Sequence, residues 1–165
     1  MKTLSLIQPW ATLVAIGAKR IETRSWATKY RGPLAIHASK KVDRVICLKK
    51  EFAIPLNEHG FVLVKDLPVG AVIATCTLVD CMKVRTLRPV KRDGKIVMTA
   101  FLEAENSLLE VNGNELAFGD YTPGRYAWIL EDVRTLPEPV PAKGMLGLWS
   151  WEPPEEVGKQ CKNTG

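Results

Sequence analysis

The stretch GAKRIETRSW, residues 17–26, places Lys19, Glu22 and Arg24 close together. If residues 20–24 are extended, Glu22 and Arg24 share one face of a strand, because side chains alternate along it. Lys19 lies in the preceding turn and can reach the same side. Converging charges are costly unless they are paired, and Glu22 is the natural partner of both cations. Two interpretations stay open: a surface salt-bridge ladder worth about 0–1 kcal/mol per pair, or a site for an anionic or strongly polar ligand.

Nucleic acids and nucleosides are one ligand class that fits these residues. Phosphate contacts set the affinity of such complexes, and aromatic side chains stack on bases. The candidate phosphate contacts are Lys19, Arg24, Arg31, Lys40 and Arg125, and the candidate stacking residues are Trp10, Trp26, Tyr30 and Tyr121. Tyr121 and Arg125 lie in the turn-rich stretch FGDYTPGR, residues 118–125, which favours their exposure. We expect Trp128, Trp149 and Trp151 to belong to the core.

Hydrolysis is the alternative chemistry of the same cluster. Glu22 could act as a general base on water, with Lys19 or Arg24 stabilising a developing oxyanion. A single-strand ribonuclease could use Lys19, Arg24 and His37, although His37 lies between Ile36 and Ala38, where a structural histidine is the commoner identity. The two histidines show no metal-ligand spacing with carboxylates or cysteines, so we expect neither a metal nor a cofactor.

The charge of the chain is unevenly distributed. The 165 residues carry a net charge of +5. Residues 1–50 hold 11 basic and 2 acidic side chains, a balance of +9, whereas the remainder holds 12 basic and 16 acidic, a balance of −4. A basic surface of this kind faces polyanions, although a solvated helix face carrying Lys40, Lys41 and Lys49 is a simpler explanation. The four cysteines show no paired spacing, and we see no signal sequence or membrane span. These features predict a cytoplasmic protein in a reducing environment, without an obligate protein partner.

The hydrophobic pattern predicts more strands than helices. Because the strands are irregularly spaced and show no alternation with helices, a small mixed barrel is favoured over a doubly wound sheet. The predicted strands are residues 2–7, 19–26, 34–38, about 71–84, 126–136 and 145–152; the predicted helices are 9–16, 41–52 and 99–110; and residues 86–97 form a loop or loose hairpin. Residues 153–165 are predicted to form a polar, disordered tail.

The spacing Gly17-x-Lys19-x-x-Glu22-x-Arg24 resembles the GxKxxExR signature of the ASCH domain family. Further blocks of the chain are similar to single-domain members of that family: SLIQPWATLVAIG, RSWATKYRGPLAIHASK, LPVGAVIATCTL, FGDYTPGRYAWIL and KGMLGLWSW. The resemblance implies an α+β fold, a PUA-like small mixed β-barrel with flanking helices, over residues 1–152. It also implies a cleft into which the signature residues project.

The family resemblance implies several functions. Members have been linked to RNA binding, coactivator complexes, ribonuclease activity and hydrolysis of N4-acylated cytidine. The amidohydrolase branch uses a lysine, a threonine and a distant glutamate. Lys19 matches the lysine, but Glu22 occupies the threonine position, which argues against a threonine nucleophile. The acid has four candidates, Glu103, Glu105, Glu110 and Glu115.

The sequence therefore predicts an RNA-binding or nucleobase-binding domain whose basic cleft contains Lys19, Glu22 and Arg24. In this interpretation Glu22 either orients the cations or accepts a hydrogen bond from an exocyclic amine of a base. The cluster would then serve ligand binding and not the stability of the fold, so that Lys19→Ala weakens binding without unfolding the protein.

Overall fold

The computed structural model describes residues 1–105 and 107–154, and its main feature is one mixed sheet. The strands follow the order β2-β7-β4-β3-β1-β8, with β5 paired to β4 and β6 to β5. Among the strands of the described residues, only the β1 and β3 pair is parallel. The strands are β1 (Lys2–Gln8), β2 (Ile21–Arg24), β3 (Gly32–Val42), β4 (Ala71–Arg92), β5 (Lys95–Ala104), β6 (Ser107–Val111), β7 (Tyr126–Pro141) and β8 (Leu148–Ser150). The helices are α1 (Trp10–Ala15), α2 (Arg44–Cys47), α3 (Lys50–Glu58), the 3-10 turn η1 (Val64–Asp66) and α4 (Gly113–Ala117).

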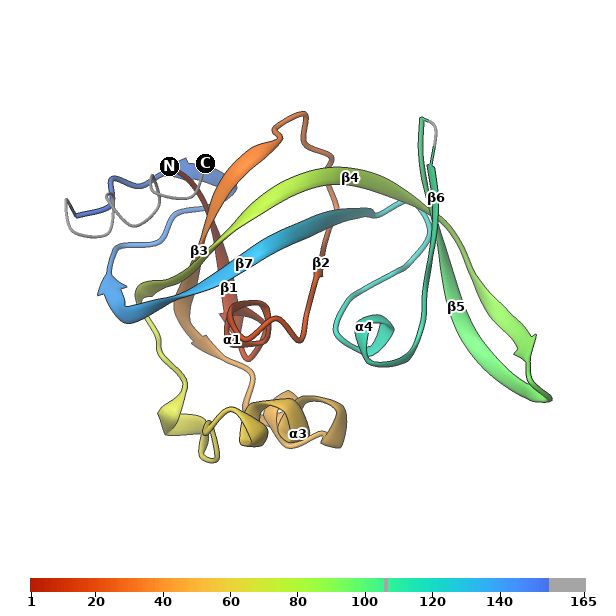
Figure 1. Ribbon diagram of the computed structural model, residues 1–165, viewed down its shortest axis with the longest axis horizontal. Coiled ribbons are helices and arrows are strands. Elements are labelled where there is room, and N and C mark those ends of the chain that lie inside the picture. The colour runs from red at the N-terminus through yellow and green to blue at the C-terminus, as the bar shows by residue number, and fades with distance from the viewer. Residues whose placement is uncertain (106, 155–165) are drawn as a thin grey trace.

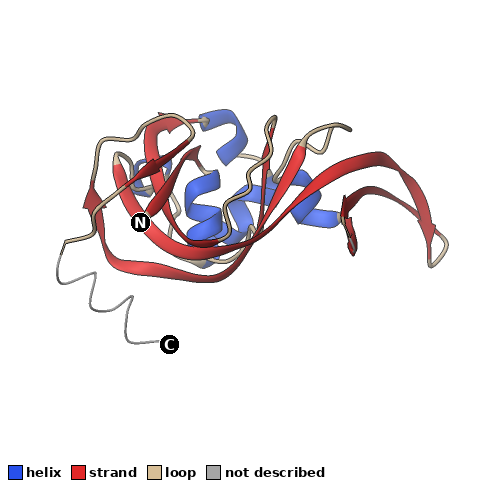
Figure 2. Ribbon diagram, turned by 90° about the horizontal axis from the view of Figure 1, so that it is seen from above, coloured by secondary structure: helices blue, strands red, loops and turns tan. Residues whose placement is uncertain are grey.

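The two longest strands, β4 and β7, run through the middle of the sheet. Three register shifts interrupt their pairing, after Val72, Thr75 and Leu78. Such irregularities bend a strand and increase its twist, and the sheet accordingly curves around the helices (Figure 1, Figure 2). The main core lies inside this curve, where Leu34, Ile36 and the indole of Trp128 are fully buried. The predicted core tryptophans Trp128, Trp149 and Trp151 are all buried, as expected.

The barrel expected from the family resemblance is not confirmed. Among the described residues the strand pairing ends at β2 on one side and at β8 on the other. A side chain bridges β2 to β1 instead: the Arg24 guanidinium donates through Nη2 to the main-chain oxygen of Ser5, at 3.1 Å. Helix α1, which connects these two strands in the chain, buries Ala11 and Val14 in the main core. The coarser expectation of a strand-rich fold with few helices is confirmed.

The helix predicted for residues 99–110 is wrong. Residues 99–104 belong to β5, which pairs with the far half of β4, and residues 107–110 belong to β6, which pairs with β5; together these strands make an arm that projects from the body of the molecule (Figure 1). Alanine, leucine and glutamate favour helices, but Ala100 and Leu102 alternate with Phe101 and Glu103, so a strand buries the apolar pair. The hairpin expected at Asp93-Gly94 is confirmed, with both residues at positive φ, 47° and 77°.

The helix predicted for residues 41–52 is displaced. Strand β3 continues to Val42, and the Asp43 carboxylate then accepts a hydrogen bond from the Ile46 amide at 3.0 Å, which caps α2. Helix α3 begins only at Lys50. The predicted polar tail, residues 153–165, lies outside the described residues from residue 155 on. Within the described part of the chain, no helix has the length and apolar character needed to cross a membrane.

Candidate functional site

Strand β2 presents Glu22 and Arg24 on one face, as the alternation predicted. The strand pairs with β7, where Glu22 lies opposite Trp128 and Arg24 opposite Tyr126. Arg24 Nε lies 3.2 Å from Glu22 Oε1, and the side chains are 27% and 11% exposed respectively. The carboxylate is therefore mostly removed from water but keeps one accessible edge.

Lys19 supports this carboxylate from inside the protein. Its side chain is fully buried, its Nζ lies 3.5 Å from Glu22 Oε2, and it donates to the main-chain oxygen of Ile21. The burial follows from the turn after α1: Gly17 adopts φ +77°, and the Lys19 amide bonds to the Leu13 carbonyl at 2.9 Å. Lys19 therefore does not project into an open cleft, contrary to what the family resemblance implied. A buried cation needs its partners, so Lys19 belongs to the fold as well as to the site.

A cavity of about 370 Å³ opens at the junction of β1 and β2. Glu22 and Arg24 form one wall, Trp10 another, and residues 117–120 a third. Lys19 does not line it. The volume lies at the lower end of the range of about 300–1000 Å³ that holds small-molecule ligands. The cavity therefore combines an acceptor carboxylate, a guanidinium donor and an aromatic ring in a space of nucleobase or nucleoside size.

The Trp10 ring is held in place by its neighbours. Its Nε1 donates to the Phe118 carbonyl at 2.7 Å, and its ring meets Phe52 edge to face at 5.8 Å between centroids. The ring is half-buried. This wall of the cavity is consequently built before any ligand arrives, which lowers the entropic cost of binding.

Tyr121 is not the exposed stacking residue that the loop composition predicted. It is 2% exposed, and its hydroxyl has no hydrogen-bond partner among the described residues. Burial, together with the nearby carboxylates of Glu115 and Glu22, raises the pKa of this phenol. Tyr121 therefore belongs to a hydrophobic cluster with Met82, Val84 and Leu102, and it does not line the cavity.

Glu115 is the candidate acid that the fold brings to the signature segment. Its carboxylate accepts hydrogen bonds from the main-chain amides of Arg20 and Ile21, at 2.9 and 3.1 Å. Burial raises its pKa, while these amides and the charge of Lys19 oppose the shift. Glu115 lines a different cavity, together with Arg20 and Ile21. Its contacts fix the start of β2 and do not reach the space in front of Glu22.

The other candidate acids lie on the arm or at its edge. Glu103 and Glu110 form ion pairs with Arg85 and Arg92. Glu105 is exposed at the end of β5. None of these three lines the cavity, so the structure does not assemble the lysine and acid pair of the amidohydrolase branch around it.

The remaining predicted site residues are spread over the surface. Arg31 pairs with Asp80 at 2.9 Å, and Arg125 pairs with Asp120 at 3.3 Å. Trp26 is 36% exposed and packs edge to face on Trp128 at 4.7 Å. Lys40 lines another, larger cavity. Of these, only Arg125 contacts the site, through Asp120 on the rim.

Sequence reasoning missed Ser5 and the role of Thr23. Ser5 binds Arg24 through its main-chain oxygen, and no side-chain pattern could have indicated that contact. Thr23 Oγ1 accepts a hydrogen bond from the Asp120 amide at 2.9 Å, which joins β2 to the rim loop. A cluster of three or more metal-ligating side chains was not found in the described part of the chain.

Comparison with known proteins confirms the family resemblance. The sequence model of the ASCH domain matches residues 4–139, and the chain belongs to this family. Two curated relatives, the proteins named activating signal cointegrator 1 from Homo sapiens and from Mus musculus, are each 37% identical to it over 82 residues. The match covers 48% of this chain and 14% of each relative, so it spans about one seventh of their length.

Proposed function

We propose that the cavity at the junction of β1 and β2 binds a nucleobase of RNA, or of a modified nucleoside. One observation carries the proposal: a carboxylate held between two cations lines a cavity that also contains an ordered tryptophan. Glu22 accepts hydrogen bonds from an exocyclic amine or ring N–H, and Arg24 donates to a base carbonyl. Membership of the ASCH family, which is associated with RNA binding, supports this assignment.

Binding has more support here than hydrolysis. The lysine of the hydrolytic mechanism corresponds to Lys19, which is fully buried and already bound to Ile21 and Glu22. The nearest candidate acid, Glu115, lines a separate cavity. A hydrolase would need Lys19 and Glu115 to contact the same substrate. A protein that only binds a nucleobase needs the exposed edge of Glu22 and the guanidinium of Arg24.

The test blocks the cavity without disturbing the buried charges. Ala117 is exposed and lines the cavity, so Ala117→Trp fills it from the rim. Asn114→Trp adds the same ring to an exposed position of α4 outside the cavity and serves as the matched control. We expect Ala117→Trp to abolish binding of nucleoside monophosphates and short single-stranded RNA, measured by calorimetry, and Asn114→Trp to bind like the wild type. Equal binding by all three proteins would overturn the proposal.

Turnover is measured with the same proteins. Wild type and Ala117→Trp are incubated with N4-acylated cytidines and single-stranded RNA, and the products are read by mass. We expect intact substrates with both proteins. A mass change that disappears in Ala117→Trp would instead assign the cavity to a hydrolase.

A further inference from the structure

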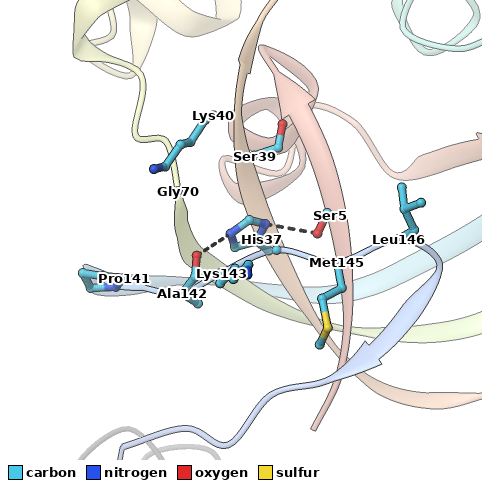
Figure 3. A pocket seen from close by; sticks show the side chains of 11 residues that line it. Ser5, His37, Ser39, Lys40, Gly70, Pro141, Ala142, Lys143, Met145 and Leu146 are labelled. Atoms are coloured by element: carbon cyan, nitrogen blue, oxygen red, sulfur yellow. Dashed lines mark hydrogen bonds between the residues drawn. The ribbon is translucent and has the colours of Figure 1, made fainter.

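A second and larger cavity, of about 880 Å³, lies on the other side of Ser5 from the first. Its walls are the end of β3 with Ser39 and Lys40, the segment at Gly70, and the loop of residues 141–146 (Figure 3). Ser5 lines both cavities. Its main-chain oxygen binds Arg24 of the first site, and its side chain faces His37 of the second. The two cavities therefore meet at one residue of β1.

A hydrogen-bond network fixes the floor of this second cavity. His37 is 2% exposed, with Nε2 3.0 Å from the Ala142 carbonyl and Nδ1 3.1 Å from Ser5 Oγ (Figure 3). Since a carbonyl only accepts, Nε2 carries the proton, and Nδ1 accepts from the Ser5 hydroxyl. Trp149 Nε1 donates to the same hydroxyl oxygen at 3.1 Å. All donors and acceptors of the imidazole are used, so His37 positions the walls and is not free to bind a ligand.

The loop of residues 141–146 is seated directly on this imidazole. A Cβ on Gly144 would lie only 2.4 Å from His37 Cε1 and 2.9 Å from Ser5 Oγ, so only glycine permits the approach. The loop thus forms a defined wall that carries Lys143, Met145 and Leu146.

The side chains around this cavity divide into a cationic part and an apolar part. Lys40 and Lys143 are exposed, and no acidic side chain is among its described lining residues. Met145 and Leu146 are 53% and 99% exposed, which leaves an apolar surface uncovered beside the cations. A ligand that satisfies both parts carries negative charge next to a weakly polar group, and a nucleotide, with its phosphate and its base, has this composition.

We propose that this second cavity holds the nucleotide adjoining the base bound at Glu22 and Arg24, so that the ligand is a single-stranded oligonucleotide and not a free nucleoside. The proposal rests on the proposed function of the first cavity. The connecting phosphate passes Ser5, the residue shared by the two cavities, and Lys40 and Lys143 neutralise the phosphates on the far side. The neighbouring base lies against Met145 and Leu146.

The experiment compares ligand length in wild type and in Lys40→Ala/Lys143→Ala. Nucleoside monophosphates and hexanucleotides of single-stranded RNA are titrated by calorimetry at several salt concentrations. For the wild type we expect the hexanucleotide to bind at least tenfold more tightly. The double variant should lose most of this gain, keep the affinity for the monophosphate, and lower the salt slope by about 1.4, because each neutralised phosphate of a single strand contributes about 0.7. Lys50→Ala/Lys65→Ala removes two exposed lysines that line neither cavity and should bind like the wild type.

The outcomes separate this inference from the proposed function. Equal binding of monophosphate and hexanucleotide by the wild type, or an unchanged length dependence in Lys40→Ala/Lys143→Ala, would overturn the second subsite while leaving the first intact. The same loss in both double variants would overturn it too, because the lysines would then act only through net charge. If the wild type binds neither ligand, the proposed function itself falls.

Discussion

At the scale of single residues, the charges of the signature segment serve two purposes at once. Lys19 is fully buried and contacts Glu22 and the Ile21 carbonyl, whereas Glu22 and Arg24 line the cavity. The buried lysine holds the carboxylate in a position where it lines the cavity and stays partly exposed. The free-energy cost of burying the Lys19 ammonium is offset by the Glu22 carboxylate, whose Oε2 lies 3.5 Å from Lys19 Nζ.

This arrangement predicts a stability loss for Lys19→Met. Removing one partner of a buried pair costs about 3–5 kcal/mol, and we expect the lower end, about 3 kcal/mol, because Arg24 still neutralises Glu22. Urea unfolding followed by tryptophan fluorescence measures it. Lys50→Met changes the same residue type at an exposed position and should alter the free energy of unfolding by less than about 0.5 kcal/mol. A similar small effect of both substitutions would show that Lys19 contributes nothing to the fold.

At the scale of elements, β1 does more than the short strand predicted for residues 2–7 implied. It pairs with β3 and β8, accepts the Arg24 bridge from β2, and through Ser5 separates the two cavities. His37 joins three parts of the chain here, because it lies on β3, bonds to Ser5 on β1, and bonds to Ala142 in the loop after β7. The walls of the second cavity therefore depend on one neutral imidazole.

The protonation of His37 predicts how stability depends on pH. Burial lowers the pKa of His37 from its usual 6.5, with the bond to Ala142 opposing the shift. A histidine whose pKa is lower in the folded state than in the unfolded state contributes fully to the free energy of unfolding at a pH above its unfolded pKa. This contribution is lost as the pH falls through the pKa of the folded state. The free energy of unfolding should thus fall below pH 6.5 more steeply in the wild type than in His37→Gln. Parallel curves for the two proteins would contradict this.

The elements also show how far sequence reasoning extends. Alternation along residues 20–24 predicted the shared face of Glu22 and Arg24, because that pattern is local. The burial of Lys19 depends on the turn at Gly17, and the cavity depends on residues 117–120 reaching β1 and β2, so neither could be predicted from spacing. Residues 99–110 were wrongly predicted as a helix because the pairing of β5 with β4, and of β6 with β5, overrides their helix propensity.

At the scale of the whole molecule, the arm separates from the body and its cavities. Beyond Arg88 and Thr99, which lie opposite each other, the arm consists of exposed or half-buried residues. Residues 89–98 carry Lys91, Arg92 and Lys95 against one acidic residue, Asp93, a local balance of +2. The tip also exposes Ile96, and none of its residues lines either cavity.

Replacing residues 89–98 by Asn-Gly should leave a folded protein that binds single-stranded RNA like the wild type. Asn-Gly suits the two-residue turn needed between Arg88 and Thr99, and the Arg88 guanidinium keeps its position 4.6 Å from the centre of the Phe101 ring. The removed segment contributes little to the core, so we expect Tm to change by less than about 4 °C, which corresponds to about 1 kcal/mol. Thermal unfolding and calorimetry test the two expectations separately. A large fall in Tm would make the arm part of the folding unit. If the variant keeps its stability but binds RNA more weakly and with a smaller salt dependence, the arm contributes to the RNA-binding surface together with the cavities.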